Sequence, residues 1–367
     1  MKTLFLILTF KIGFFSILYG QTSPTRFKED IDVFLLIGQS NMQGVAPITE
    51  SDTLPLKNVF LLTSDYDWEP ARNLTNQGMN RYSSVKKNPK TLYGPAYSFG
   101  RKIEQLTNKK IGIISNARGA TRIEWWQKGF EGDTSYHLQS DFDLYENAVL
   151  RVKETLERYP NARLKAILWH QGEANNHPNR SVFYLNHLKK LISQFRIYFQ
   201  DPHLPFIVGE VGTWNKRGEQ INPILNSINN YISNTYCVNS FGLTSIDLEK
   251  NDPHFDNLSQ KVLGERYAIA VAKLAYSVSV KGVQLFSEYN FKGKDIILTE
   301  GSYGIDEIND SGLLVHEIKS IKCDPGFLFE FISEKNKSTF NSSQLKMEKI
   351  PFNVIKVKST KIVEKNN

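Results

Sequence analysis

The chain has 367 residues, of which 40% are hydrophobic and 12% aromatic. This composition excludes global disorder, and the length exceeds what one compact domain usually needs. The formal net charge is +7, spread over the whole chain. No basic block is dense enough to predict a nucleic-acid partner, so we interpret the charge as that of an ordinary solvated surface.

The first twenty residues, "MKTLFLILTFKIGFFSILYG", have a lysine near the start and an apolar stretch that ends in small residues before Gln21. This pattern predicts a signal peptide over residues 1–20, and hence a secreted or periplasmic protein. The alternative is an N-terminal membrane anchor, for which the stretch is short. No later stretch could span a bilayer, so we expect no integral membrane segment in the mature chain.

Between Asp30 and about Ser277, short apolar runs alternate with longer amphipathic segments. The apolar runs predict buried strands at 32–38, 59–62, 111–117, 165–171, 205–211 and 240–246. The amphipathic segments predict helices at 93–107, 141–158, 180–199, 217–234 and 257–277. This alternation predicts an α/β domain over 30–277, a parallel sheet covered on both faces. Ligands bind such sheets beyond the carboxyl ends of the strands.

After Val278 the sequence changes to short alternating runs and glycine turns without a long helical period. This texture predicts a separate all-β domain over residues 278–360.

The first predicted strand ends in "GQSNMQG", residues 38–44, where Ser40 lies at the start of a helix. Ser40 is a candidate nucleophile, and its backbone N–H could face a developing oxyanion. The alternative role of Ser40 is helix capping. The third predicted strand leads into "NARGATRIEWW", where the N–H of Gly119 is a second candidate oxyanion donor or the residue is a plain turn glycine.

In the same segment, Arg122, Trp125 and Trp126 could form a wall on which a sugar stacks. An interior aromatic cluster explains the two tryptophans equally well.

The fourth predicted strand ends in "WHQGEANN", which places polar side chains directly after a buried strand. Gln171 could donate to an oxyanion, and Glu173 could orient a histidine; a surface ion pair is the alternative for Glu173. His254 follows the last predicted strand and is the candidate general base, with Asp252 two residues before it. A metal site of His254, Asp252 and Asp256 is disfavoured because no second histidine has suitable spacing, so we predict no metal and no cofactor.

The two cysteines, Cys237 and Cys323, are too few for a zinc site. We interpret them as buried free thiols, with a disulfide as the alternative in an exported chain.

Four blocks now stand in order: "GQSNM" at 38–42, "RGAT" at 118–121, "HQGE" at 170–173 and "DPHFD" at 252–256. With them, residues 30–275 resemble the SGNH hydrolases, and more closely the sialate O-acetylesterases, a branch that includes the acetylxylan esterases of carbohydrate esterase family six. The resemblance implies a three-layer α/β/α fold with a flavodoxin-like sheet, and hydrolysis of O-acetyl esters on carbohydrates without a metal.

The resemblance also implies roles for individual residues. Ser40 would be the nucleophile and His254 the general base, and the oxyanion would be held by Ser40 N–H, Gly119 N–H and the Gln171 side chain. Asn41 is expected to contact the substrate together with Arg122, Trp125 and Trp126.

One departure from the family leaves the third catalytic residue open. The family usually has Asp three residues before the histidine, where this chain has Asn251, and Asp252 is only two residues before. Either Asp252 or Glu173 could orient His254, and we favour Glu173 slightly.

The C-terminal part resembles βγ-crystallin domains of two Greek-key motifs, on the pattern "FSEYNFKG" at 286–293. The usual calcium positions read Val315-His316 and Lys319-Ser320, which predicts no calcium there. A generic β-sandwich is the alternative.

The sequence therefore predicts a serine carbohydrate esterase that acts through an acetyl-enzyme. A catalytically inactive acetyl-glycan-binding protein of the same fold is the alternative. A lipase or thioesterase would need an apolar acyl tunnel, which the polar segments after the third and fourth strands do not suggest.

Overall fold

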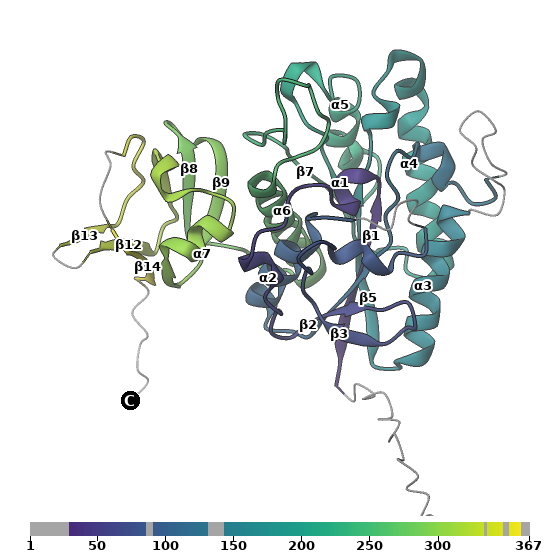
Figure 1. Ribbon diagram of the computed structural model, residues 1–367, viewed down its shortest axis with the longest axis horizontal. Coiled ribbons are helices and arrows are strands. Elements are labelled where there is room, and N and C mark those ends of the chain that lie inside the picture. Colours follow the sequence, from purple (N-terminus) through teal and green to yellow (C-terminus); the bar gives the residue numbers. More distant parts are fainter. Residues whose placement is uncertain (1–28, 86–90, 131–142, 334–335, 348–351, 361–367) are drawn as a thin grey trace, which may run out of the picture.

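The computed structural model describes residues 29–85, 91–130, 143–333, 336–347 and 352–360, so the predicted signal peptide lies outside the described residues. Figure 1 shows a larger α/β part, which contains α1 to α6, beside a smaller β part. Among the described residues, no helix is long and apolar enough to cross a membrane.

The α/β part is built on one seven-stranded sheet in the order β3-β2-β4-β1-β5-β6-β7. The strands are β1 Ile31–Gly38, β2 Val59–Leu62, β3 Trp68–Pro70, β4 Ile111–Ser115, β5 Ala162–His170, β6 Phe206–Gly209 and β7 Thr235–Val238. All pairs are parallel except β2 with β3. Apart from the β2–β3 hairpin, the strand order is that of flavodoxin, and the chain reverses its direction of winding at β1, where such sheets bind ligands.

Helices cover both faces of this sheet (Figure 1). They are α1 Ser40–Gln43, α2 Ala96–Thr107, α3 Leu144–Arg158, α4 Pro178–Tyr198, α5 Asn222–Asn226 and α6 Asn257–Tyr276. Shorter 3-10 turns lie at Ser51–Thr53, Met79–Tyr82, Ile123–Trp126, Glu173–Asn175, Trp214–Lys216, Ile228–Asn230 and Val315–Glu317.

The side chains of β1 alternate between the two cores. Phe34 and Leu36 face the core of α2 and α6, whereas Val33 and Leu35 face that of α3 and α4. A strand that is covered on both faces is apolar along nearly its whole length, which explains the apolar run of β1. The helices on both faces of the sheet confirm the predicted three-layer α/β/α fold.

Two predicted elements are wrong. The last strand is not at 240–246 but at Thr235–Val238, since Gly242 has a φ of +76° and the following residues form only an isolated bridge from Ser245 to Phe255. The helix predicted at 217–234 is only the short α5 and one 3-10 turn. Asn222, at its start, uses its side chain to bond the backbone of Val211, and such local bonds compete with helix.

The β part has two small sheets, ordered β11-β8-β9 and β10-β14-β12-β13. Its elements are β8 Val283–Glu288, β9 Lys292–Leu298, β10 Gly301–Gly304, α7 Ile305–Asp310, β11 Ser320–Cys323, β12 Phe327–Ile332, β13 Lys337–Phe340 and β14 Val354–Ser359. β10 leaves its sequence neighbours to pair with β14, and Gln344 returns to bridge Ile321. This exchange of segments between sheets confirms the predicted Greek-key β domain.

The β part packs against α2 and α6. The Lys102 ammonium donates to the Ile297 carbonyl at 2.7 Å, and the Arg266 guanidinium pairs with Asp295 at 2.5 Å. The apolar core on this side of the sheet continues into the β part without a break.

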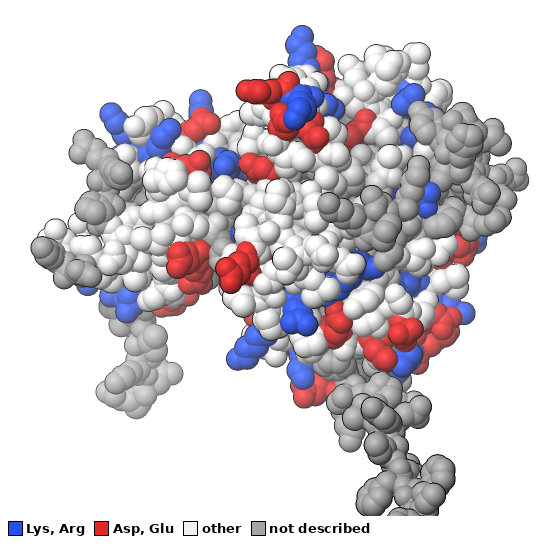
Figure 2. All heavy atoms as spheres, viewed as in Figure 1, with Lys and Arg blue, Asp and Glu red and all other residues white. Residues whose placement is uncertain are grey.

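Figure 2 shows acidic and basic side chains interspersed on the face of the molecule that Figure 1 presents. Cys237 and Cys323 are free and half-buried.

Candidate active site

The nucleophile candidate lies at the turn that ends β1. Gly38 has a φ of +135°, and a Cβ there would lie 2.1 Å from the carbonyl oxygen of His170. Only glycine fits this turn. The chain passes from Gly38 through Gln39 into α1, which begins at Ser40. Ser40 is thereby held where β1 ends, at the point where the winding of the sheet reverses.

The Ser40 hydroxyl, the His254 ring and the Asp252 carboxylate form one hydrogen-bonded chain. Ser40 Oγ lies 3.0 Å from His254 Nε2, and His254 Nδ1 lies 2.7 Å from Asp252 Oδ1. A carboxylate facing Nδ1 holds the proton on that nitrogen and leaves Nε2 to accept one from the hydroxyl. The side chains of His254 and Asp252 are 21% and 31% exposed, so a substrate can reach the site.

Asp252 reaches the ring because two hydrogen bonds fix its backbone carbonyl. Its carbonyl accepts hydrogen bonds from Trp214 Nε1 and Ser245 Oγ, both at 2.9 Å. Its Oδ1 also accepts the backbone N–H of His254 at 2.8 Å. One carboxylate oxygen therefore holds both the backbone and the ring of His254, which compensates for the spacing that is one residue short.

The slight preference for Glu173 as the residue that orients His254 is wrong. Glu173 Oε1 instead accepts a hydrogen bond from Asn41 Nδ2 at 2.5 Å. Desolvation in this buried position raises the pKa of the Glu173 carboxyl, against the hydrogen bond from Asn41, which lowers it. At the family's usual acid position, Asn251 Oδ1 accepts from Arg217 Nε at 3.1 Å and from Asn215 Nδ2 at 3.2 Å, whereas His254 Nδ1 is bonded to Asp252.

The oxyanion-hole prediction is corrected in one member. Gly119 lies beside Ser40, since a Cβ built on Gly119 would be 3.5 Å from the Cβ of Ser40. Its N–H donates to Gln43 Oε1 at 2.8 Å. Gln171 is fully buried, and its Nε2 faces Asn175 Oδ1 at 2.8 Å and Thr121 O at 3.0 Å. The amide hydrogens of Gln171 are used inside the protein, and its side chain has no exposed surface that a substrate could reach.

Three of the four predicted substrate contacts are also corrected. Asn41 and Trp126 are fully buried, and Trp125 is 4% exposed. Trp126 packs edge-on against Trp169 with ring centroids 5.3 Å apart, which is the interior aromatic cluster considered as the alternative. Arg122 alone of the four is half-exposed, and it lies over the Trp125 ring.

Sequence reasoning missed Trp214. Its ring packs edge-on against Phe255 at 5.3 Å, and its indole N–H holds the Asp252 carbonyl. The signal was present, because Trp214 follows the fifth predicted strand just as the other site residues follow theirs.

The metal alternative is not supported, since Asp256 caps α6 by accepting from Ser259 N at 2.7 Å. No cluster of three or more potential ligands exists in the described ranges.

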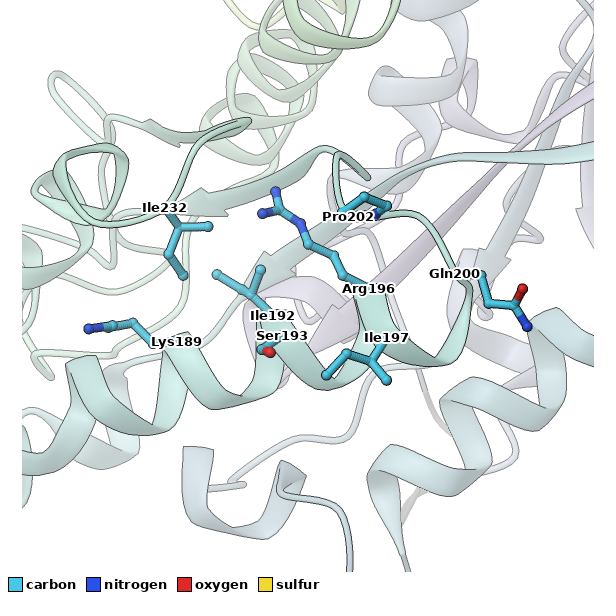
Figure 3. Close-up of a pocket in the computed structure, with 8 residues that line it drawn as sticks. All are labelled: Lys189, Ile192, Ser193, Arg196, Ile197, Gln200, Pro202 and Ile232. Atoms are coloured by element: carbon cyan, nitrogen blue, oxygen red, sulfur yellow. The ribbon is translucent and has the colours of Figure 1, made fainter.

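A separate cavity of about 550 Å³ lies against α4 (Figure 3). Its lining is Lys189, Ile192, Ser193, Arg196, Ile197, Gln200, Pro202 and Ile232. Gln200 and Pro202 precede β6, so this cavity is at the amino end of a strand. The site of Ser40 is at the carboxyl ends, and the cavity is no part of it.

The chain belongs to the carbohydrate esterases described as sialic acid-specific acetylesterases, whose family model matches residues 30–273. It is a carbohydrate O-acetylesterase by this membership. No curated protein matches the chain significantly.

Two of the matching solved structures show the same α/β fold at low identity. A protein from Arabidopsis thaliana is 23% identical with a TM-score of 0.56, and the match covers 66% of this chain and 98% of that one. NanS is 16% identical with a TM-score of 0.51, over 68% of this chain and 99% of its own. A βγ-crystallin domain from Flavobacterium johnsoniae is 20% identical over 22% of this chain and 97% of its own, with a TM-score of 0.20.

Proposed function

We propose that this protein is an exported serine esterase that removes acetyl groups from a sugar or polysaccharide, of the acetylxylan or sialic-acid type, through an acetyl-enzyme. The observation that carries the proposal is the continuous contact from Ser40 through His254 to Asp252. The family match supports the acetylated carbohydrate as the substrate class. The apolar N-terminal stretch supports export.

The reaction proceeds in two acyl transfers. His254 Nε2 takes the Ser40 proton while Ser40 Oγ attacks the acetyl carbonyl. The bond to the sugar oxygen breaks, and His254 returns the proton to that oxygen, so the sugar leaves as an alcohol. His254 then takes a proton from water, which attacks the acetyl carbonyl of the acetyl-enzyme. The bond to Ser40 Oγ breaks, His254 returns the proton to that oxygen, and acetate leaves.

The charge that develops on the carbonyl oxygen needs donors beside Ser40. We assign this role to the backbone N–H groups of Ser40 and Gly119, two neighbouring residues in the loops that follow β1 and β4. A donor of this kind lowers the barrier by about 3 kcal/mol. Because Gly119 N–H donates to Gln43 in the free protein, the substrate must displace that contact.

The test is acetate release from 4-nitrophenyl acetate, acetylated xylan and O-acetylated sialic acid by the mature chain. We expect Ser40→Ala to abolish release, and Asp252→Asn to lower kcat by about 10⁴-fold because the histidine would take the wrong tautomer. Release that survives in Ser40→Ala would refute the mechanism. A wild-type chain inert on all three substrates would favour the acetyl-glycan-binding alternative, and a preference for long-chain esters would favour a lipase.

A further inference from the structure

Asn41, the residue after the proposed nucleophile, is fully buried and has every hydrogen-bonding position of its side chain occupied. Its Nδ2 donates to Glu173 Oε1 at 2.5 Å and to the Pro253 carbonyl at 3.1 Å. Its Oδ1 accepts the Phe255 N–H at 3.1 Å and Gln260 Nε2 at 3.3 Å. A carboxamide has two donor hydrogens and two acceptor positions, so this set is complete.

Two of these bonds go to the backbone on either side of His254. Pro253 precedes the histidine and Phe255 follows it, so a single amide holds both flanks of the residue. Asn41 is itself bonded covalently to Ser40. The amide therefore ties the histidine loop to the nucleophile across more than two hundred residues of chain.

Glu173 helps the backbone of Pro253 and Phe255 to determine which way this amide faces. If the Asn41 amide turned over, its oxygen would face the Glu173 carboxylate and the Pro253 carbonyl, and both contacts would be repulsive. In the observed orientation Nδ2 has two acceptors, Glu173 Oε1 at 2.5 Å and the Pro253 carbonyl at 3.1 Å, of which Glu173 is the closer. The second oxygen, Glu173 Oε2, is buried with no hydrogen-bond partner among the described residues, an arrangement that favours a positional role over a contribution to stability.

We infer that Asn41 and Glu173 are positioning residues that set the distance between Ser40 and His254, with Glu173 acting through Asn41 rather than on the histidine. This inference rests on the proposed roles of Ser40 and His254. It gives the glutamate of the "HQGE" block a function that direct contact with the imidazole does not provide in this chain.

The test compares Asn41→Ala, Glu173→Ala and Glu173→Gln in the full mature chain. On 4-nitrophenyl acetate, Asn41→Ala and Glu173→Ala should each lower kcat by about a hundredfold with KM near the wild-type value, because the base is misplaced rather than the substrate lost. Glu173→Gln still offers an oxygen to Asn41 Nδ2 and should lose only about fivefold. The double alanine variant should lose no more than Asn41→Ala alone.

Several results would overturn the inference. A loss of about 10⁴-fold in Glu173→Gln, with a shifted pH profile of kcat/KM, would make Glu173 the acid that orients His254 directly. If the losses in kcat multiply in the double variant, the two residues act independently. If the losses appear in KM alone, the residues act on substrate binding and not on the position of the base.

Asn222→Ala is the matched control. Asn222 is also buried, and its amide bonds both backbone groups of Val211 at 3.0 Å rather than those of Pro253 and Phe255. An equal kcat loss in Asn222→Ala would show that the loss in Asn41→Ala comes from general destabilisation and not from a misplaced His254.

A second readout separates failure of the inference from failure of the proposed function. The rate at which a fluorophosphonate probe labels Ser40, followed by intact mass, needs no acetyl substrate. If the wild type is labelled but releases no acetate, the function fails while the inference still predicts slower labelling in Asn41→Ala. Equal labelling of wild type and Asn41→Ala would refute the inference.

Discussion

His170, the histidine of the "HQGE" block, should make the protein lose stability on mild acidification. The residue is fully buried, and its Nδ1 lies 3.1 Å from the Tyr267 hydroxyl, which itself donates to the Trp169 carbonyl. Nδ1 therefore carries the proton, and Nε2 is buried with no hydrogen-bond partner among the described residues. Desolvation lowers the pKa of His170 from 6.5 to about 3.

The sign follows from proton uptake. Between pH 6.5 and 3 the unfolded chain binds a proton on His170 and the folded chain does not, so stability falls as the pH falls. At pH 5 the loss relative to neutral pH is about 2 kcal/mol for a group with an unfolded pKa of 6.5. Glu173 has a raised pKa in the folded state, so its contribution to stability falls as the pH rises. Glu173 is present in every variant compared, so the comparison between variants isolates His170.

The assay is urea unfolding at pH 7.5 and pH 5 for wild type, His170→Gln and the exposed control His203→Gln. All five tryptophans lie before residue 278, so their fluorescence reports the α/β part. We expect the loss between the two pH values to be about 2 kcal/mol smaller in His170→Gln than in wild type, and unchanged in His203→Gln. Equal losses in His170→Gln and wild type would mean that His170 is protonated in the folded state, as an ion pair with Glu173 at 3.8 Å.

Two further predictions concern the site and the domain contact. Gln43→Ala should raise kcat/KM for acetyl esters about fivefold, because the Gly119 N–H no longer donates to Gln43 and one hydrogen bond is worth about 1 kcal/mol; a fall in kcat would show instead that the Gln43 amide assists catalysis. Arg266→Ala should lower the free energy of unfolding by about 2 kcal/mol in urea, since Asp295 loses a charged partner that is 9% exposed. The exposed pair of Lys153 with Glu157 provides the control, where Lys153→Ala should change stability by less than about 0.5 kcal/mol.

Much of the site could be predicted because its positions follow local rules. Gly38, Ser40 and Gly119 lie at or shortly after the ends of buried strands, and a parallel sheet brings the carboxyl ends of its strands to one edge. His254 follows the sheet's last strand, and its contact with Ser40 bears out that arrangement even though the strand lies at Thr235–Val238 rather than at 240–246. The spacing of apolar residues along the sequence was enough to predict the sheet, the long helices and the change to an all-β domain.

The direction in which each side chain points was decided only by the tertiary structure. Asp252 rather than Glu173 reaches His254, because Trp214, which follows a different strand, and the nearby Ser245 hold the Asp252 carbonyl. Gln171 and Asn41 resemble substrate contacts in the sequence, but both are buried. A buried amide must be satisfied by whatever polar groups the fold brings to it. Each of these amides has a partner 132 residues away, Glu173 for Asn41 and Gln39 for Gln171, which is beyond the reach of any local pattern.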